Sequence, residues 1–249
     1  MTNSAIVIIT RLIATNKQAR DQILEHFHTI ALYSSVNEPG VLKYASCLPD
    51  DAKDETTVYV IEEHLDKPTY DAHMSLQPVT SFTAALQDKS NPLITSDTKI
   101  YTVAWTPALL SRDDRLPSNA MKTTAYDLRA RIEHPYILFA TITDPDKEDI
   151  DTLEPYGAAI VKYATENEPD TIFYADARPV EPSPEARATG AEASAGGFIC
   201  AVEVYASKEA CMKHLQDESV KDLAVEGNKL GSKFEIVPMV MNEGWLIRE

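Results

Sequence analysis

Two histidines are the clearest candidates for proton transfer in this chain. His73, in the segment "YDAHM", and His214, in "CMKHL", stand 141 residues apart in matching segments that we expect to be helical. Imidazole titrates near neutral pH, so either ring can act as a general base or donate a hydrogen bond to a phenolic substrate. The alternative is a structural role, in which the ring bonds a backbone carbonyl or packs between helix and sheet. Retention in both segments favours the structural role, because catalysis needs only one competent copy.

Each histidine segment is preceded by a glutamate on an expected β-strand. Glu62 occurs in "VIEEH", and His64 follows it two residues later on the same face of the strand. The matching segment "AVEVY" holds Glu203 and, two residues on, Tyr205. A glutamate beside an apolar cavity has a raised pKa and can take a phenolic proton; capping of the next helix or pairing with a cation is the alternative. We hypothesise that His64, standing where the other half has a tyrosine, marks the half that does chemistry.

Four further residues are candidates for the walls of a binding site. Phe27 belongs to an apolar stripe on the first expected helix, and we expect His28 at the border of the same cavity. Tyr101 and Trp105 alternate onto one face of a strand, either as core between two sheets or as surfaces for a flat substrate. The predicted catalytic residues are thus His64, His73, Glu62 and His214, and the predicted substrate contacts are Phe27, His28, Tyr101, Trp105, Glu203 and Tyr205.

Metal and cofactor motifs are missing from the sequence. His26 and His28 are two apart on a helix, so their side chains diverge and cannot chelate one metal. There is no 2-His-1-carboxylate set, Gly-rich phosphate loop or nucleophile elbow. We therefore predict no metal and no cofactor.

A repeat connects these residues. The stretches "YSSVNEPGVLKY" (33–44) and "YATENEPDTIFY" (163–174) share both terminal tyrosines and an internal Asn-Glu-Pro. We interpret the tripeptide as a helix stop, since Asn tolerates left-handed geometry at a helix end and Pro prevents the helix from continuing. It therefore marks a duplicated domain rather than an active site.

The elements around the two stretches correspond in order, which predicts the fold. Each half is expected to run strand, helix, strand, strand, helix, strand, with an insertion in the Pro- and Ala-rich segment 178–197 of the second half. This order gives an α+β fold of two tandem ferredoxin-like (βαββαβ) units, packed sheet to sheet as an intrachain dimeric α/β barrel. The predicted domains are residues 1–107 and 134–249, joined by a linker at 108–133, in which "TAYDLRARI" could add an edge strand.

Composition and charge exclude several classes of partner. The formal net charge is −16, and so acidic a surface repels phosphate backbones and anionic lipid; we predict no nucleic-acid and no membrane partner. Three cysteines without metal-binding spacing fit a reducing compartment, and we expect a cytoplasmic protein. The apolar N-terminal run is too short for a membrane span and is expected to be a strand.

The motifs together resemble a known family. "NEPGVLKY", then "VIEEH" or "AVEVY", then a helix with "YDAHM" or "CMKHL", is similar to the antibiotic biosynthesis monooxygenase domain of the dimeric α/β-barrel superfamily. The resemblance covers about 100 residues of each half and implies oxidation of aromatic, polyketide-like or quinol substrates by dioxygen without metal or flavin. Relatives in the superfamily degrade haem, isomerise lactones, cyclise or decarboxylate polyketides, or only bind ligands, so the fold does not determine the reaction.

We therefore expect a cofactor-independent monooxygenase that acts on a small aromatic natural product. A side chain would deprotonate the substrate, and the resulting anion would react with dioxygen in a dry pocket. A cofactor-free cyclase, isomerase or decarboxylase is the first alternative, and a non-catalytic ligand-binding duplicate is the second. The expected partner is a small aromatic ligand, and association of the internal pseudo-dimer into a homodimer is left open.

Overall fold

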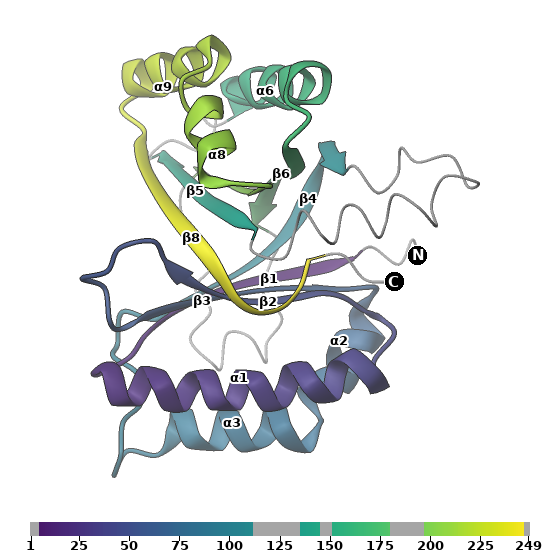
Figure 1. The fold of residues 1–249 in the computed structure, drawn as a ribbon, viewed down its shortest axis with the longest axis vertical. Coiled ribbons are helices and arrows are strands. Elements are labelled where there is room, and N and C mark those ends of the chain that lie inside the picture. Colours follow the sequence, from purple (N-terminus) through teal and green to yellow (C-terminus); the bar gives the residue numbers. More distant parts are fainter. Residues whose placement is uncertain (1–4, 112–134, 145–150, 180–196, 247–249) are drawn as a thin grey trace. The chain divides into compact units, whose positions relative to one another are not determined.

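The computed structural model describes residues 5–111, 135–144, 151–179 and 197–246, in two compact units (Figure 1). The first unit contains the described residues up to Ala104 together with those from Met241 onward. The second unit contains the described residues from Trp105 to Val240. Of the predicted linker, only the first four positions are among the described residues. The segment "TAYDLRARI" and nearly all of the predicted insertion lie outside them.

The first unit has the predicted ferredoxin-like order of elements. Its elements are β1 (Ile6–Ile13), α1 (Lys17–Asn37), β2 (Val41–Pro49), β3 (Thr57–His64), α2 (Lys67–Met74), α3 (Gln77–Gln87) and β4 (Lys99–Ser111). Strands β4, β1, β3 and β2 lie side by side in this order, all antiparallel. Helices α1 and α3 both cover one face of this sheet (Figure 1).

The second unit repeats the same order. Its elements are β5 (Tyr136–Asp144), α6 (Glu154–Asn167), β6 (Thr171–Pro179), β7 (Gly197–Tyr205), α8 (Lys208–His214), α9 (Glu218–Leu230) and β8 (Lys233–Trp245). Strands β8, β5, β7 and β6 form the antiparallel sheet. Pro155 lies in the first turn of α6, a position where the missing N–H costs no hydrogen bond.

Strands β4 and β8 each contribute residues to both units. The last residues of β4, from Trp105, belong to the second unit, and the last residues of β8, from Met241, belong to the first. Hydrogen bonding between strands follows the closed order β1-β3-β2-β8-β5-β7-β6-β4. This order confirms the predicted fold class, α+β with two tandem ferredoxin-like units in an intrachain dimeric α/β barrel.

The Asn-Glu-Pro tripeptides end helices, although by another mechanism than we expected. Helix α1 ends at Asn37 and α6 at Asn167. No residue other than glycine has a positive φ in the described part of the chain, so the expected left-handed asparagine is wrong. Each asparagine instead donates its side-chain N–H to a carbonyl of the last turn, of Tyr33 at 2.9 Å and of Tyr163 at 3.1 Å. The side chain thus adds a second donor to a carbonyl of the last helical turn and strengthens the helix end.

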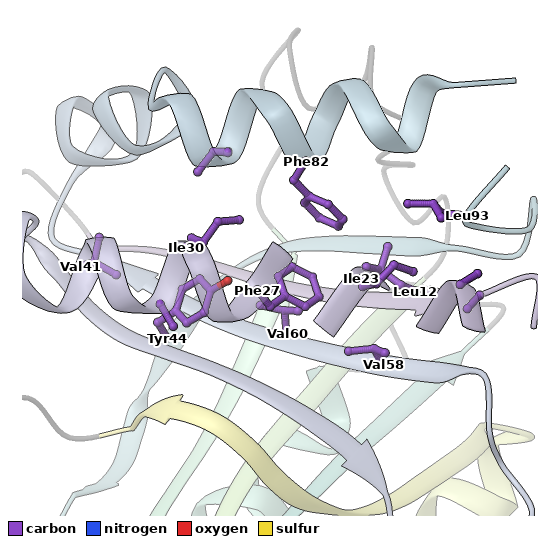
Figure 2. Packing of buried hydrophobic residues seen from close by; sticks show 14 residues of the cluster. Leu12, Ile23, Phe27, Ile30, Val41, Tyr44, Val58, Val60, Phe82 and Leu93 are labelled. Carbon is purple, nitrogen blue, oxygen red and sulfur yellow. The ribbon is translucent and has the colours of Figure 1, made fainter. Parts of the chain in front are cut away.

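The first unit has one large hydrophobic core between its sheet and helices. Ile23, Phe27 and Ile30 of the predicted stripe on α1 are buried in it. Figure 2 shows Phe27 and Phe82 meeting between α1 and α3, with ring centroids 4.9 Å apart in an edge-to-face arrangement. Among the described residues of the second unit, the buried apolar side chains form smaller clusters than the one in the first unit.

No helix in the part of the chain that the structure describes is long and apolar enough to cross a membrane.

Candidate active site

A buried histidine in the first unit is held by the glutamate of the tripeptide. His73 on α2 donates from Nδ1 to Oε2 of Glu38, the residue that caps α1, at 2.9 Å. The hydroxyl of Ser34 donates to the same carboxylate oxygen at 2.5 Å. Burial lowers the pKa of His73, but the hydrogen bond to Glu38 and the charges of Glu62 and Glu38 outweigh burial and raise it.

Glu62 lies between two histidines in the same cluster. His64 donates from Nε2 to Oε2 of Glu62 at 3.1 Å, and His73 Nε2 lies 3.9 Å from that oxygen. Burial pushes the pKa of Glu62 upward, yet the bond to His64 and the attraction of both histidines leave this pKa below its usual range. The predicted catalytic residues His64, His73 and Glu62 are therefore brought together, and both histidines are almost completely buried.

A corresponding cluster exists in the second unit. His214 donates from Nδ1 to Oε2 of Glu168 at 2.8 Å, and Thr171 donates its hydroxyl to the same oxygen at 2.9 Å. His214 Nε2 lies 3.7 Å from Oε2 of Glu203. Burial lowers the pKa of His214, but the bond to Glu168 and the negative charges of Glu203 and Glu168 raise it overall.

The hydrogen-bond donors to Glu203 are tyrosines, whereas the donor to Glu62 is a histidine. The hydroxyls of Tyr205 and Tyr174 both donate to its carboxylate. Burial raises the pKa of Glu203 and, despite the attraction of His214, keeps it above its usual range. The two equivalent glutamates thus have pKa values shifted in opposite directions. Their hydrogen-bond partners differ in two ways: Tyr205 replaces His64, and Tyr174 donates to Glu203 whereas the hydroxyl of Tyr44 has no hydrogen-bond partner among the described residues.

Two members of each cluster were missed by sequence reasoning. The corresponding pairs are Glu38 and Glu168, Tyr44 and Tyr174, Glu62 and Glu203, His64 and Tyr205, and His73 and His214. The first two pairs lie inside the repeated stretches, so the identical Glu and the closing Tyr were the available signal. Our interpretation as a helix stop explained the Asn and the Pro of the tripeptide and left its Glu without a role.

A cavity of about 80 Å³ lies in the second unit, between its sheet and helices α6, α8 and α9. Four polar side chains contribute to its wall: Tyr174, Asp176, Glu203 and His214. The other side chains that line it are aliphatic except for Phe234. The volume is several times the roughly 10–15 Å³ that one water needs, so the cavity can admit the end of an organic ligand.

Residue size explains why this space is open in the second unit. At three corresponding positions the first unit has the larger residue: Phe27, Phe82 and Val60 correspond to Gly157, Leu223 and Ala201. In the first unit these three larger side chains fill the core (Figure 2). In the second unit Leu223 and Ala201 line the cavity, and Gly157 lines a hollow that shares part of its wall.

Asp176 on β6 is a site residue that the sequence did not reveal. It lines the cavity and also a smaller neighbouring hollow of about 20 Å³, together with Gly157, Glu154 and Arg178. Burial and the negative charge of Glu203 raise the pKa of Asp176 to about 7, against the opposing effect of Arg178. The corresponding residue of the first unit is Ser46, so comparison of the two halves shows no shared residue at this position.

The residues predicted as walls lie elsewhere. Phe27 is part of the packed core, and His28 is exposed with Nδ1 2.6 Å from Glu243. Tyr101 is partly buried on β4. Trp105 packs edge-to-face on Phe173 at 5.5 Å; by the alternation of side chains along β6, Phe173 faces away from the cavity side that Tyr174 faces.

The predicted residues of the second unit divide into two groups. His214 and Glu203 line the cavity. Tyr205 is fully buried behind them and contacts the site through its hydrogen bond to Glu203. Among the described residues no group of three or more His, Cys, Asp or Glu side chains is arranged to hold a metal ion.

Comparison with solved structures reveals full-length likeness. A protein of Fusobacterium nucleatum whose name assigns it provisionally as a monooxygenase is 15% identical, with a TM-score of 0.68 over 100% of this chain and 99% of that one. A Lactobacillus acidophilus protein with the same provisional name is 14% identical, with a TM-score of 0.64 over 99% and 100% of the two chains. The chain therefore shares the fold of these two proteins over its full length. An anthrone oxidase-like protein is 10% identical, with a TM-score of 0.60 over 97% and 93% of the chains.

These identities are low, so the likeness confirms the resemblance at the level of the fold and leaves the reaction open. No family model and no curated protein matches the sequence.

Proposed function

We propose that this chain is a cofactor-independent monooxygenase that binds a small aromatic substrate in the cavity of the second unit and deprotonates it for reaction with dioxygen. The observation that carries the proposal is a cavity that is apolar except for a wall formed by Tyr174, Asp176, Glu203 and His214. The monooxygenase and anthrone oxidase-like names of the full-length structural neighbours support the same reaction class.

The wall is suited to stabilise an anion. The carboxylates of Glu168 and Glu203 raise the pKa of His214, which favours a positively charged ring beside the cavity. A substrate anion formed there would meet this charge in surroundings with little water, where electrostatic attraction is strong. Of the two roles that the sequence suggested for a histidine, general base or hydrogen-bond donor, His214 would take the second, acting by charge and orientation.

The reaction balances without an external reductant. In a substrate of the anthrone type, a CH₂ group between two aromatic rings loses a proton, and the carbanion–enolate then transfers electrons to dioxygen. The carbon is oxidised to a carbonyl that keeps one oxygen atom, and the other oxygen atom leaves as water with the two hydrogens. The protein would contribute orientation, proton transfer and a dry cavity.

The cavity volume restricts what can enter. An apolar cavity of roughly 150 Å³ accommodates benzene, so a cavity of about 80 Å³ takes only the reacting end of a polycyclic substrate unless lining side chains move. A substrate with several rings would extend beyond the described cavity.

Oxygen consumption with an anthrone-type substrate tests the proposal. His214→Gln should lower kcat/KM by about 10²-fold or more, since removing one group that stabilises developing negative charge costs roughly 10²–10³-fold. His73→Gln is the matched control, because His73 has the same hydrogen-bond geometry in the unit whose core is filled. The control should lose similar stability and keep kcat/KM within about threefold of wild type. Equal activity loss in both variants would contradict a site in the second unit.

Anaerobic assays separate the alternatives. A cyclase, isomerase or decarboxylase would use the same wall without oxygen, so product formation under strict anaerobiosis would rule out the monooxygenase. Binding of the substrate with no turnover under air would instead support a ligand-binding duplicate. A cytoplasmic location, the absence of nucleic-acid and membrane partners, and formation of a homodimer stay predictions from the sequence.

A further inference from the structure

Asp176 is placed on the cavity wall without a hydrogen-bond partner among the described residues. Its carboxylate lies against α6 at Gly157, where an added Cβ would stand only 2.4 Å from Oδ2 of Asp176. Any larger residue at 157 would therefore displace the carboxylate or the helix. Asp176 is partly exposed, and burial together with the nearby negative charges makes its ionised form less stable, so a ligand that donates a hydrogen bond to the carboxylate would be favoured there.

Strand register places Asp176 and Glu203 on the same cavity wall. Tyr174 pairs with Glu203 across β6 and β7, and Asp176 pairs with Ala201. Residues directly opposite each other share one face of the sheet, so Asp176 and Glu203 are diagonal neighbours, at a typical separation of about 7–8 Å. The small side chain of Ala201 leaves the space beside Asp176 open. Two carboxyl groups thus border one apolar cavity.

The charges around Asp176 oppose its ionisation. Glu203 on β7 and Glu154 on α6 are negative groups that raise its pKa, and Arg178 on β6 is the cation that lowers it. The other titratable groups near this wall are Tyr174 on β6, Cys200 on β7 and His214 on α8. The lining side chains of β5, β8 and α9 carry no charge. An anionic ligand group is therefore disfavoured beside Asp176, and a hydrogen-bond donor is the group that suits its carboxyl.

We propose that Asp176 is the proton acceptor of this cavity, and that its ligand is a neutral aromatic ring with a hydroxyl donor and an apolar body. The hydroxyl donates to Asp176, and its proton then moves to a carboxylate oxygen. Asp176 becomes neutral, the O–H electron pair stays on the substrate as a phenolate, and the negative charge passes to the ring that faces His214. The inference rests on the proposed function and names its substrate class. Ligands with a carboxylate are disfavoured, since they would add negative charge beside Asp176 and Glu203.

Phenol is the probe for the hydroxyl, and anisole, its methyl ether, is the matched ligand without a donor. Binding to the full chain is measured by NMR under argon from about pH 5.5 to about pH 8.5. Phenol affinity should rise roughly five- to tenfold across this range, because a hydrogen bond to an ionised acceptor is stronger than one to a neutral acceptor. The midpoint should lie near the Asp176 pKa of about 7. Anisole affinity should stay constant.

Three variants assign the rise to Asp176. Asp176→Asn keeps the shape and removes the ionisation, so the rise should disappear; Asp176→Glu should restore part of it. Glu154→Gln removes a negative charge beside the same hollow and should keep the rise. If the Asn variant fails to fold, Asp176→Ser introduces the residue of the first unit and gives the same comparison.

Two results would overturn the inference: a rise in phenol affinity that persists in Asp176→Asn, or the same rise with anisole. In turnover assays Asp176→Asn should lower kcat more than it raises KM and should remove the acid limb of the pH–rate profile. Lack of oxygen uptake by the wild type would contradict the proposed function, while the phenol titration would still decide the role of Asp176.

Discussion

At the scale of single residues, the glutamate of each Asn-Glu-Pro tripeptide has two functions. Its backbone N–H bonds a carbonyl of the preceding helix, of Ser34 for Glu38 and of Ala164 for Glu168. Its side chain accepts a hydrogen bond from a buried histidine on the next helix. One residue thus ends a helix and fixes the orientation of an imidazole, which explains why the glutamate is present in both halves although only one half has the described cavity.

Replacing Glu38 by Gln should lower the free energy of unfolding by about 1.5–3 kcal/mol, the usual value of a hydrogen bond to a charged group. The loss should depend on pH. The raised pKa of His73 stabilises the folded state below the unfolded value of 6.5, and this contribution disappears as pH rises through the folded pKa. The lowered pKa of Glu38 stabilises the folded state above pH 4.5, and this stabilisation is lost as the pH falls through the folded pKa of Glu38.

The free energy of unfolding of wild type and of Glu38→Gln should therefore differ most between about pH 4.5 and about pH 6.5. Urea unfolding over a pH series measures this difference. Glu55→Gln, at an exposed position, is the control and should change stability by less than about 0.5 kcal/mol. A difference that stays constant over the whole range would show that the carboxylate is not coupled to His73.

The exchange of His64 for Tyr205 gives a reciprocal prediction. Tyr205→His should lower the pKa of Glu203, because in the first unit the histidine and its hydrogen bond keep the pKa of Glu62 low. His64→Tyr should raise the pKa of Glu62 for the same reason. The C=O stretch of a protonated carboxyl group in infrared spectra, followed against pH, measures both shifts. Shifts of the same sign in the two variants would contradict this explanation.

At the scale of elements, the packing of helices on the sheet decides where a ligand can enter. Helix α1 presents Phe27 to the sheet, and α6 presents Gly157 at the corresponding position. Helix α3 adds Phe82 in the first unit, whereas α9 has Leu223. The polar cluster is nearly the same in both units, so its surroundings and not its members distinguish a potential site from a packed core.

Leu223→Phe introduces the residue of the first unit into the cavity. The added ring should fill part of it and reduce phenol affinity by about tenfold or more, with a stability change within the roughly 1–3 kcal/mol that overpacking costs. Binding is measured by the same NMR titration as for the wild type.

Phe82→Leu is the reciprocal control. It should cost about 1–3 kcal/mol, since it removes buried ring atoms from the core cluster, and it should leave phenol affinity unchanged. Unchanged phenol binding in Leu223→Phe would show that the ligand site lies outside the cavity described.

At the scale of the whole molecule, two strands are shared between the units. Strand β4 begins in the first unit and its end belongs to the second, whereas β8 begins in the second unit and its end belongs to the first. The end of β8 comes close to β2, because Gly244 adopts a φ of +112° and an added Cβ would stand 2.0 Å from the carbonyl oxygen of Tyr44. Tyr44 also stacks on Trp245 with ring centroids 5.6 Å apart. The C-terminal end of the strand is thus a structural part of the first unit.

Gly244→Ala should therefore destabilise the protein by more than about 2 kcal/mol in urea unfolding, since it combines backbone strain with a collision against the main chain. Gly231→Ala is the matched control: its φ of +78° is also strained, but nothing lies within 4 Å of an added Cβ. This control substitution should lower the free energy of unfolding by only about 1–2 kcal/mol. Equal effects would mean that the end of β8 can move away from β2 at little cost.

Much of the fold followed from local patterns. Strand and helix order, the helix stops and the apolar stripe of α1 depend on periodicity and on capping chemistry, which act over a few residues. The same local patterns brought His64, His73 and Glu62 into one predicted set. They did not reveal Glu38 and Glu168, because the contact of each with its histidine joins residues 35 and 46 positions apart.

By itself, the sequence determined the duplication, the tandem ferredoxin-like order and the matched histidines and glutamates of the two halves, because repeats and periodicity are properties of the chain. Only the tertiary structure decided that Phe27 is core and not a wall, that the cavity lies in the second unit, and that Asp176 faces it. These facts depend on which side chains meet when helices pack on a sheet. A single exchange of Phe for Gly at one helix position changes that packing without altering the pattern from which the fold is predicted.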